Sequence, residues 1–243
     1  MTIAAKVSSA ELTAQVTNRF EDKYLEGRLI NATGTSYIPG TTDDAAFLGF
    51  EVAAGTGGYV RQVFKYETAD ILAYSDDGVP LNRKATIFAQ DGGETSIDFS
   101  HVALCWSSGN VLTLNPTVTA PSAGVDGTYT NIPTTTSGSG TGLLVDLTIT
   151  NSGAAATDYV LTVQHAGSGY AAADSITIAD GVLAGLGAIT GGAGSLGTTV
   201  ATVNMDANAG NLVTVAETAS PVVLTGGNEA VFYWDLKMFG FYN

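Results

Sequence analysis

Basic residues are scarce in this 243-residue chain, which has nine Lys and Arg against 23 Asp and Glu. From Ala85 to Leu236 there is neither Lys nor Arg, whereas twelve acidic residues fall in the same stretch. The formal net charge of −14 therefore reflects a shortage of bases more than an abundance of acids. Because contacts to a nucleic-acid backbone need Lys and Arg, this balance argues against a nucleic-acid partner.

Cysteine and long apolar runs are also lacking. Cys105 is the only cysteine, which excludes an intrachain disulfide and a cysteine-based zinc site, and we expect a small buried thiol. No run approaches the roughly 18 apolar residues that cross a membrane, so we expect no membrane partner. Met1–Lys6 lacks the basic start and apolar stretch of a signal peptide, which predicts synthesis in a cytoplasm.

Residue types that carry catalysis are few. His101 and Cys105 are four positions apart in an extended run, so they share a face but lie about 13 Å apart, too far for a base and its nucleophile. The chain has no Gly-x-Ser-x-Gly elbow, no phosphate-binding Gly-Lys-Ser/Thr loop and no His-Glu-x-x-His helix. We therefore expect no catalysis and no cofactor.

Paired carboxylates and aromatic side chains leave one contrasting function open, that of a carbohydrate-binding module or a glycan-active enzyme. The candidate acids are Asp76, Asp77, Asp91, Glu94 and Asp98. All but Asp98 lie in predicted turns, where Asp stabilises the bend. Asp76, Asp77 and Asp91 could instead hold Ca²⁺, although their spacing fits no EF-hand loop. Trp106 and Trp234 could form a sugar platform, but both lie in apolar strands that are typical of a core or a subunit interface.

The N-terminal residues predict an arm followed by a helix. Ser8-Ser-Ala-Glu11 has capping-box spacing. Gly27 is the first stop signal, although Leu29 and Ile30 could extend the helix. Apolar side chains recur every four positions on one helical face: Leu12, Val16, Phe20 and Tyr24. This stripe fits packing on the protein's own β domain or on a neighbouring subunit, and the sequence favours neither.

The rest of the chain predicts a mainly β fold, an antiparallel β-sandwich or barrel-like domain with an inserted module. Turn signals recur every ten to fifteen residues between strand-like runs such as 46–52 and 69–74. Residues 116–211 hold sixteen of the thirty glycines but only three of the 21 aromatics. We expect three parts: an arm and helix (1–35), an aromatic-rich β domain (36–115 plus 212–243) whose two segments pair as neighbouring strands, and an inserted Gly/Ser/Thr-rich β module (116–211) with a mobile loop at 181–194.

The segment Asp158–Ile178 combines a strand, the turn Gly167-Ser-Gly-Tyr170, Asp174 and the short strand Ile176-Thr-Ile178. It resembles a module common in virion structural proteins of tailed bacteriophages. The resemblance implies a symmetric homo-oligomer such as a trimer, located in the virion after synthesis in the host cytoplasm, and bound to the major capsid protein or to tail proteins.

Within that class we expect a non-enzymatic capsid-decorating, cement-type protein that docks through its N-terminal arm and projects the glycine-rich module. A tail or baseplate adaptor, or a short-fibre component, is the alternative. The side chains expected at an interface are Leu12, Val16, Phe20, Tyr24, Trp106, Trp234 and Phe239.

Overall fold

The computed structural model describes residues 9–39, 42–72, 79–190 and 192–238. The prediction of a mainly β chain is confirmed, and all strand pairs are antiparallel. None of the sheets that these residues form closes into a barrel, so the sandwich-like form applies. The chain divides into unit 1, Met1–Trp106 with Leu212–Asn243, and unit 2, Ser107–Asn211.

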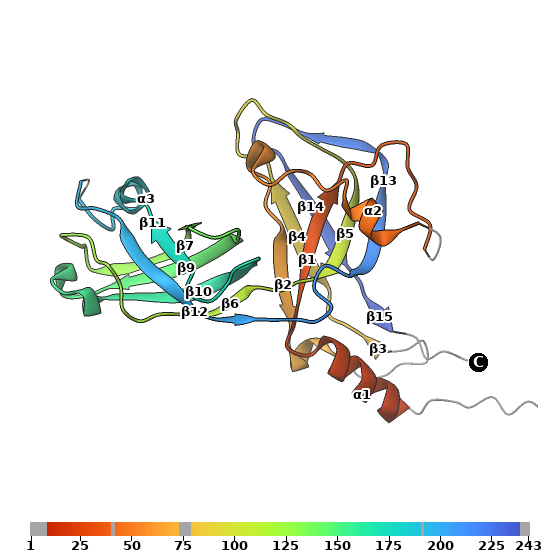
Figure 1. Cartoon of the computed structure of the whole chain (residues 1–243), viewed down its shortest axis with the longest axis horizontal. Coiled ribbons are helices and arrows are strands. Elements are labelled where there is room, and N and C mark those ends of the chain that lie inside the picture. Colours follow the sequence, from red (N-terminus) through yellow and green to blue (C-terminus); the bar gives the residue numbers. More distant parts are fainter. Residues whose placement is uncertain (1–8, 40–41, 73–78, 191, 239–243) are drawn as a thin grey trace, which may run out of the picture. The chain divides into compact units, whose positions relative to one another are not determined.

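Unit 1 contains a four-stranded sheet and two small two-stranded sheets (Figure 1). In spatial order the four strands are β13 (Leu212–Leu224), β5 (Ile97–Trp106), β1 (Lys23–Ile30) and β2 (Gln62–Tyr66). The small sheets are formed by β14 (Glu229–Trp234) with β4 (Lys84–Ala89), and by β15 (Lys237–Met238) with β3 (Val79–Pro80). Since β5 and β13 come from the two segments that flank the glycine-rich middle, the expected pairing of these segments is present.

The main core of unit 1 lies on one face of the four-stranded sheet. Side chains alternate along β1, and Leu25 and Leu29 point into a cluster with Phe88 of β4 and Trp234 of β14. Between them stands Gly27, where a Cβ atom would come within 2.9 Å of Thr86 Cγ2. A glycine is needed there because β4 approaches the backbone of β1 so closely.

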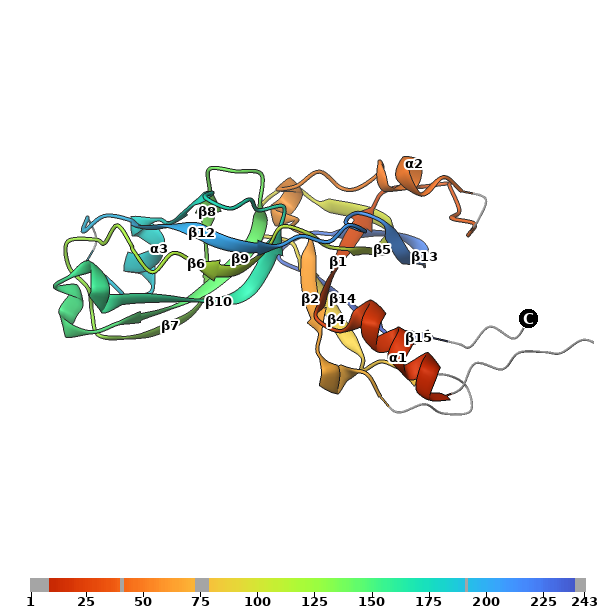
Figure 2. The same cartoon turned by 60° about the horizontal axis from the view of Figure 1, so that its bottom comes forward.

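The opposite face of the same sheet is covered by α2 (Asp44–Leu48), so α1 and α2 lie on opposite sides of it (Figure 2). The prediction of a strand at 46–52 is wrong. The Asp43 carboxylate accepts hydrogen bonds from the backbone N–H groups of Ala45 and Ala46, which starts a helix at this point. Phe47 of that helix is buried against the sheet.

Helix α1 spans Ser9–Phe20, and the predicted extension of the helix to Gly27 is wrong. Asp22 adopts a left-handed conformation (φ 58°), and the chain then enters β1 at Lys23. Tyr24 is therefore a strand residue. Residues 23–30 form an inner strand between β5 and β2, so this part of the predicted arm and helix (1–35) belongs to the sheet of unit 1. Ser8 of the predicted capping box lies outside the described residues.

Unit 2 has two sheets around its own core. One is ordered β10 (Tyr159–Ser168), β9 (Thr141–Ile149) and β7 (Gly127–Pro133). The other is ordered β6 (Asn110–Leu114), β12 (Leu196–Asn204), β11 (Ser175–Ile178) and β8 (Thr135–Thr136). The strand at 110–114 was expected in the aromatic-rich domain, but it pairs with β12, which moves the observed boundary from 116 to 107.

The segment 181–194 was expected to be a mobile loop. The structure instead places α3 (Asp180–Gly185) here, and Leu183, Ala188 and Ile189 are buried in the core of unit 2. The Asp180 carboxylate accepts the backbone N–H groups of Gly192 and Gly194, which closes the loop that follows. Local glycine content was misleading because burial of three apolar side chains offsets the backbone entropy.

Other elements differ from prediction in detail. Runs 211–216 and 221–225 are one strand, β13, with irregular register between Glu217 and Val222. Within 69–74, the described residues contain a 3₁₀ turn and a single bridge at Ile71, but no strand. The 3₁₀ turns are η1 (Thr56–Gly58), η2 (Thr68–Asp70), η3 (Asn151–Gly153) and η4 (Ala156–Asp158).

The Gly-Ser-Gly-Tyr turn has a structural reason. The Tyr170 ring is buried, and its hydroxyl accepts the Leu143 backbone N–H. The ring lies directly against the backbone of Gly140 and Gly167. A Cβ atom at Gly140 would fall 2.4 Å from this ring, and one at Gly167 would fall 2.7 Å from it. The glycines therefore serve the packing of one aromatic side chain.

Candidate functional site

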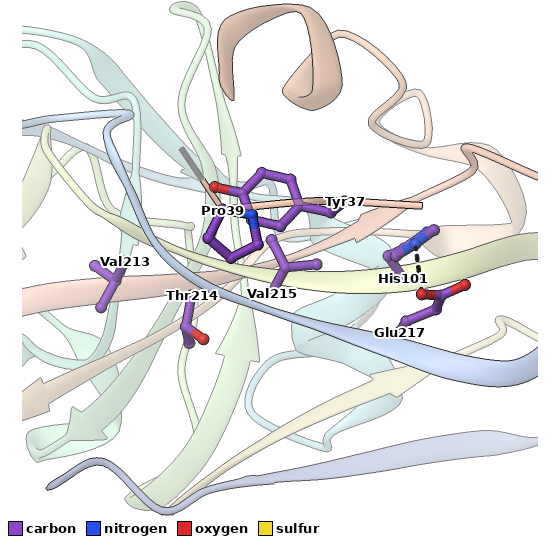
Figure 3. A pocket seen from close by; sticks show the side chains of 7 residues that line it. All are labelled: Tyr37, Pro39, His101, Val213, Thr214, Val215 and Glu217. Carbon is purple, nitrogen blue, oxygen red and sulfur yellow. Dashed lines mark ion pairs between the residues drawn. The ribbon is translucent and has the colours of Figure 1, made fainter. Parts of the chain in front are cut away.

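A pocket of about 340 Å³ lies on the α2 side of the four-stranded sheet in unit 1 (Figure 3). The register of β5 and β13 places His101 opposite Glu217 and Ala103 opposite Val215. A loop that follows β1 supplies the facing wall. The residues that line the pocket are Tyr37, Pro39, His101, Val213, Thr214, Val215 and Glu217.

The His101 imidazole is the buried polar group of this pocket. Its side chain is only 2% exposed, and its Nε2 lies 3.9 Å from Oε2 of Glu217, which is 57% exposed. No hydrogen-bond partner reaches Nε2 from the described residues. Burial lowers the pKa of His101, and the Glu217 carboxylate opposes this shift. Burial thus favours the neutral form of the imidazole.

Two aromatic rings, Phe47 and Tyr37, fix the position of His101. Phe47 presents its edge to the imidazole, with ring centroids 5.2 Å apart at 89°. Tyr37 packs on Phe47 with centroids 5.0 Å apart, and its hydroxyl donates to Oδ1 of Asp44 at 2.8 Å. Burial and this carboxylate raise the pKa of Tyr37 to about 12. The wall of the pocket is thus held by α2.

A second group of charged side chains lies nearby on the same sheet face, but it is structural. Arg61 makes a bidentate pair with Glu51 at 2.7 and 2.8 Å, and Arg28 Nε donates to Glu26 at 2.8 Å. Tyr59 also donates to Glu51, at 2.9 Å. Two carboxylates and two guanidinium groups balance, and Glu26 and Arg28 are nearly fully buried. These groups hold β1 to the segment that precedes β2.

A second hollow, of about 310 Å³, contains the predicted acid Asp98 with Glu51 and the half-exposed Phe50. An aromatic ring beside two acids is what the glycan interpretation needs. The Glu51 carboxylate, however, is already held in an ion pair with Arg61. It is therefore not available to form the second member of a catalytic carboxylate pair with Asp98. Asp91 accepts the Gly93 backbone N–H in a turn, and Asp76 and Asp77 lie outside the described residues.

Most of the predicted interface side chains belong to the core of unit 1. The buried ones are Val16, Phe20, Trp106 and Trp234. Phe20 packs against Trp106 with centroids 5.3 Å apart, and the indole of Trp234 donates to Thr86. The two tryptophans are thus unavailable as a sugar platform. Tyr24 is partly buried beside Lys65, while Phe239 and the side chain of Leu12 lie outside the described part.

Cys105 is buried as predicted. Burial raises the pKa of its thiol to about 12, so the thiolate needed for nucleophilic chemistry is not formed at neutral pH. Within the described ranges, no three His, Cys, Asp or Glu side chains come together as a metal site requires. No described helix is long and apolar enough to span a bilayer.

Sequence reasoning missed an apolar surface on the outer face of the β4–β14 sheet. Ile87 stands opposite Val231, and Ala85 stands opposite Tyr233. Their exposed fractions are large for apolar residues, 46% for Ile87, 43% for Val231 and 63% for Tyr233. The signal was present in the sequence, because both alternating phases of these two strands carry apolar residues. We call Ala85, Ile87, Val231 and Tyr233 the outer apolar face.

Comparison with known proteins adds no identification: no protein-family model, no curated protein and no solved structure matches this chain significantly.

Proposed function

We propose that this chain is a non-enzymatic structural protein of a tailed-phage virion, of the capsid-decorating type, in which unit 1 attaches and unit 2 is displayed. The observation that carries the proposal is the way unit 2 is inserted. The chain leaves β5 after Trp106 and returns at Leu212, which is paired with Cys105. A complete β module with its own core is thereby inserted between two paired strands of the unit 1 sheet.

The resemblance to virion proteins falls within the displayed unit. Its residues form β10, the turn around Tyr170 and β11. Their glycines and the Asp174 carboxylate, which accepts the Ala171 backbone N–H, serve the fold of the turn. A rigid module that presents loops suits a structural or recognition role.

The outer apolar face supports self-association of unit 1, with a second copy of this chain as its occupant. Two copies that each carry a net charge of −14 repel each other, so they approach at least cost through surfaces without carboxylates. The outer apolar face has none among its four members. Arg83 and Asp235 form an ion pair beside Tyr233 at one end of this face, and the exposed Glu229, opposite Ala89, borders Val231 at the other, so the rim is charged.

Docking through residues 1–35 as a whole is replaced by docking through unit 1, because β1 is an inner strand. The location is tested by immunogold electron microscopy of intact particles with an antibody against unit 2. Label over the head supports decoration. Label confined to the tail favours the adaptor or short-fibre alternative, and absence of label from purified particles contradicts the virion proposal.

Self-association is tested by sedimentation of two matched variants. Tyr233→Glu places a charge on the outer apolar face, whereas Val160→Glu places one on unit 2, where Val160 is similarly exposed at 56%. We expect Tyr233→Glu to dissociate the oligomer and Val160→Glu to leave it intact. Equal oligomer populations in the two variants would exclude this face as the contact.

A further inference from the structure

The second hollow of unit 1, of about 310 Å³, is formed where the end of β1, the segment after α2 and the start of β5 meet. Its lining combines one large aromatic ring with side chains that carry oxygen or nitrogen, and it contains neither Lys nor Arg. These members are Asn31, Phe50, Glu51, Thr56, Ser96 and Asp98. An aromatic wall with a few polar groups is the usual composition of a site for a small molecule.

Phe50 supplies the apolar wall of this hollow. Its side chain is 50% exposed, whereas Phe47 of the preceding helix is buried against the sheet. The backbone of Phe50 is fixed from two sides, because its N–H donates to the Phe47 carbonyl at 3.1 Å and its carbonyl accepts the Asn31 N–H at 2.9 Å. A ring on so well held a backbone is a preorganised apolar surface, and a ligand that covers it removes apolar area from water.

The polar side chains of the hollow have unused hydrogen-bonding capacity. Asp98 is exposed, and within the described ranges its carboxylate and the Ser96 hydroxyl make no hydrogen bond and no ion pair. Oδ1 of Asn31 accepts the Thr33 hydroxyl at 3.0 Å, which leaves the two amide hydrogens of Asn31 to donate. The hollow therefore offers a carboxylate, a hydroxyl and an amide donor around one aromatic ring.

The charges of the hollow indicate a neutral ligand rich in hydroxyl groups. The Glu51 carboxylate is held by Arg61 and by the Tyr59 hydroxyl, so Asp98 carries the only uncompensated charge of the lining. An anion is repelled by that charge. A cation would use the carboxylate but not the donors of Asn31. A hydroxyl group both donates and accepts, and its hydrogen bond to a carboxylate is of the strong, charge-assisted kind.

We propose that this hollow binds a neutral pyranose unit of a glycan, with one C–H face of the sugar ring against Phe50. Adjacent sugar hydroxyls donate to the Asp98 carboxylate, and another accepts from the Asn31 amide. The volume of about 310 Å³ lies at the lower end of the range for ligand sites, as suits a single sugar unit. The sugar is bound and not cleaved, because the hollow lacks a second available carboxylate.

This proposal does not depend on a location in the virion, and it is tested with the full chain and defined probes. The probes are the methyl glycosides of glucose, galactose and mannose, each compared with its uronic-acid counterpart, which carries a carboxylate in place of the primary alcohol. Saturation-transfer NMR titrations measure binding. We expect at least one neutral glycoside to bind with a dissociation constant on the order of 1 mM, and its uronic-acid counterpart to bind more weakly. Binding of none of the neutral glycosides, or equal binding of the uronic acid, would overturn the proposal.

Variants of the aromatic wall give the second test. Phe50→Ala should weaken binding at least tenfold, because the apolar surface for the sugar face is lost. Phe50→Tyr keeps the ring and should bind the same glycoside. Ile38→Ala, at a position that is 55% exposed on another loop of unit 1, should leave binding unchanged. Retained binding in Phe50→Ala, or loss of binding in Phe50→Tyr with thermal unfolding unchanged, would overturn the proposal.

The role of the carboxylate is tested separately. Asp98→Asn keeps the shape of the side chain and should weaken binding of the neutral glycoside roughly fivefold to tenfold, because charge-assisted hydrogen bonds are lost. It should also reduce the difference between the glycoside and its uronic acid. Glu229→Gln removes an exposed carboxylate of β14 and should change neither quantity. Unchanged affinity in Asp98→Asn, or equal weakening in both variants, would overturn the proposal.

Discussion

Cys105 and Leu212 are paired neighbours on β5 and β13, although the whole of unit 2 lies between them in the chain. Since paired strand residues lie about 5 Å apart, a very short linker can join the two strand ends. Unit 1 and unit 2 also have separate hydrophobic cores. Insertion at this point therefore places little constraint on either fold.

Excision of unit 2 is the first prediction. Replacement of 107–211 by a short Gly-Ser linker should leave unit 1 folded, because no strand of its sheets is removed. Excision of 116–211 should give a less stable product, because it keeps β6 but removes its partner β12, which exposes the buried side chain of Val111. Circular dichroism and thermal unfolding compare the two products. Greater stability of the second would contradict the observed boundary.

The packing of α1 gives a second prediction. Phe20 is 2% exposed and contacts Tyr66 and Trp106. Phe20→Ala should lower the free energy of unfolding by about 3–5 kcal/mol through lost burial and a cavity. Asn18→Ala, on the exposed face of the same helix, should change it by less than about 0.5 kcal/mol. Denaturant titration measures both. A neutral Phe20→Ala would mean that α1 is an arm and not part of the core.

The buried ion pair of β1 gives a third prediction. Glu26→Ala leaves Arg28 without its close partner in a site where both side chains are nearly inaccessible. The expected loss of stability is about 3–5 kcal/mol. Asp235→Ala removes a bidentate partner from Arg83, but that pair is exposed at about 60% on each side, so the loss should be far smaller than that of Glu26→Ala. Similar losses of stability in the two variants would contradict the conclusion that the Glu26–Arg28 pair is buried and the Arg83–Asp235 pair is exposed.

The pH dependence of stability follows from His101. Burial lowers the pKa of His101 below 6.5 in the folded chain, so below that pH the unfolded chain binds a proton that the folded chain does not. Stability should therefore fall as the pH drops from about 7 to about 5.5, with a slope of at most about 1.4 kcal/mol per pH unit. The Glu217 carboxylate, which faces His101, reduces this slope.

Two variants isolate that contribution. His101→Gln should flatten the dependence of the denaturation midpoint on pH in this interval, where most carboxylates stay ionised. His165→Gln serves as the control, since His165 is exposed on β10 and should leave the slope unchanged. A slope that persists in His101→Gln would assign the effect to another group.

Several features could be predicted from the sequence because they depend on local patterns. Turn residues and alternating apolar side chains located most strands, such as β11 at residues 175–178, and the burial of Cys105 follows from its apolar strand. The two helices that the sequence did not predict both depend on distant parts of the fold that bury one of their side chains. Helix α2 depends on the Asp43 cap and on a sheet that receives Phe47, and helix α3 depends on a core that receives Leu183.

The C-terminal end of α1 shows most clearly what local periodicity cannot predict. A period of four residues continues from Val16 through Phe20 to Tyr24, but the helix ends at Phe20. Between β5 and β2, a strand at 23–30 gains a ladder of hydrogen bonds on both edges, which a helix extended into this segment could not make. Distant strands therefore decided the conformation of residues 21–27, and local periodicity could not reveal this.

The sequence by itself determined a mainly β, acid-rich chain with an aromatic-rich part and a glycine-rich part, because composition and short-range periodicity encode these properties directly. Only the tertiary structure decided which polar groups meet. His101 and Glu217 are far apart in the chain, and their 3.9 Å approach depends on the register of β5 with β13. A register that differed by one residue would turn the two side chains to opposite faces of the sheet, so the pocket exists only in the folded arrangement.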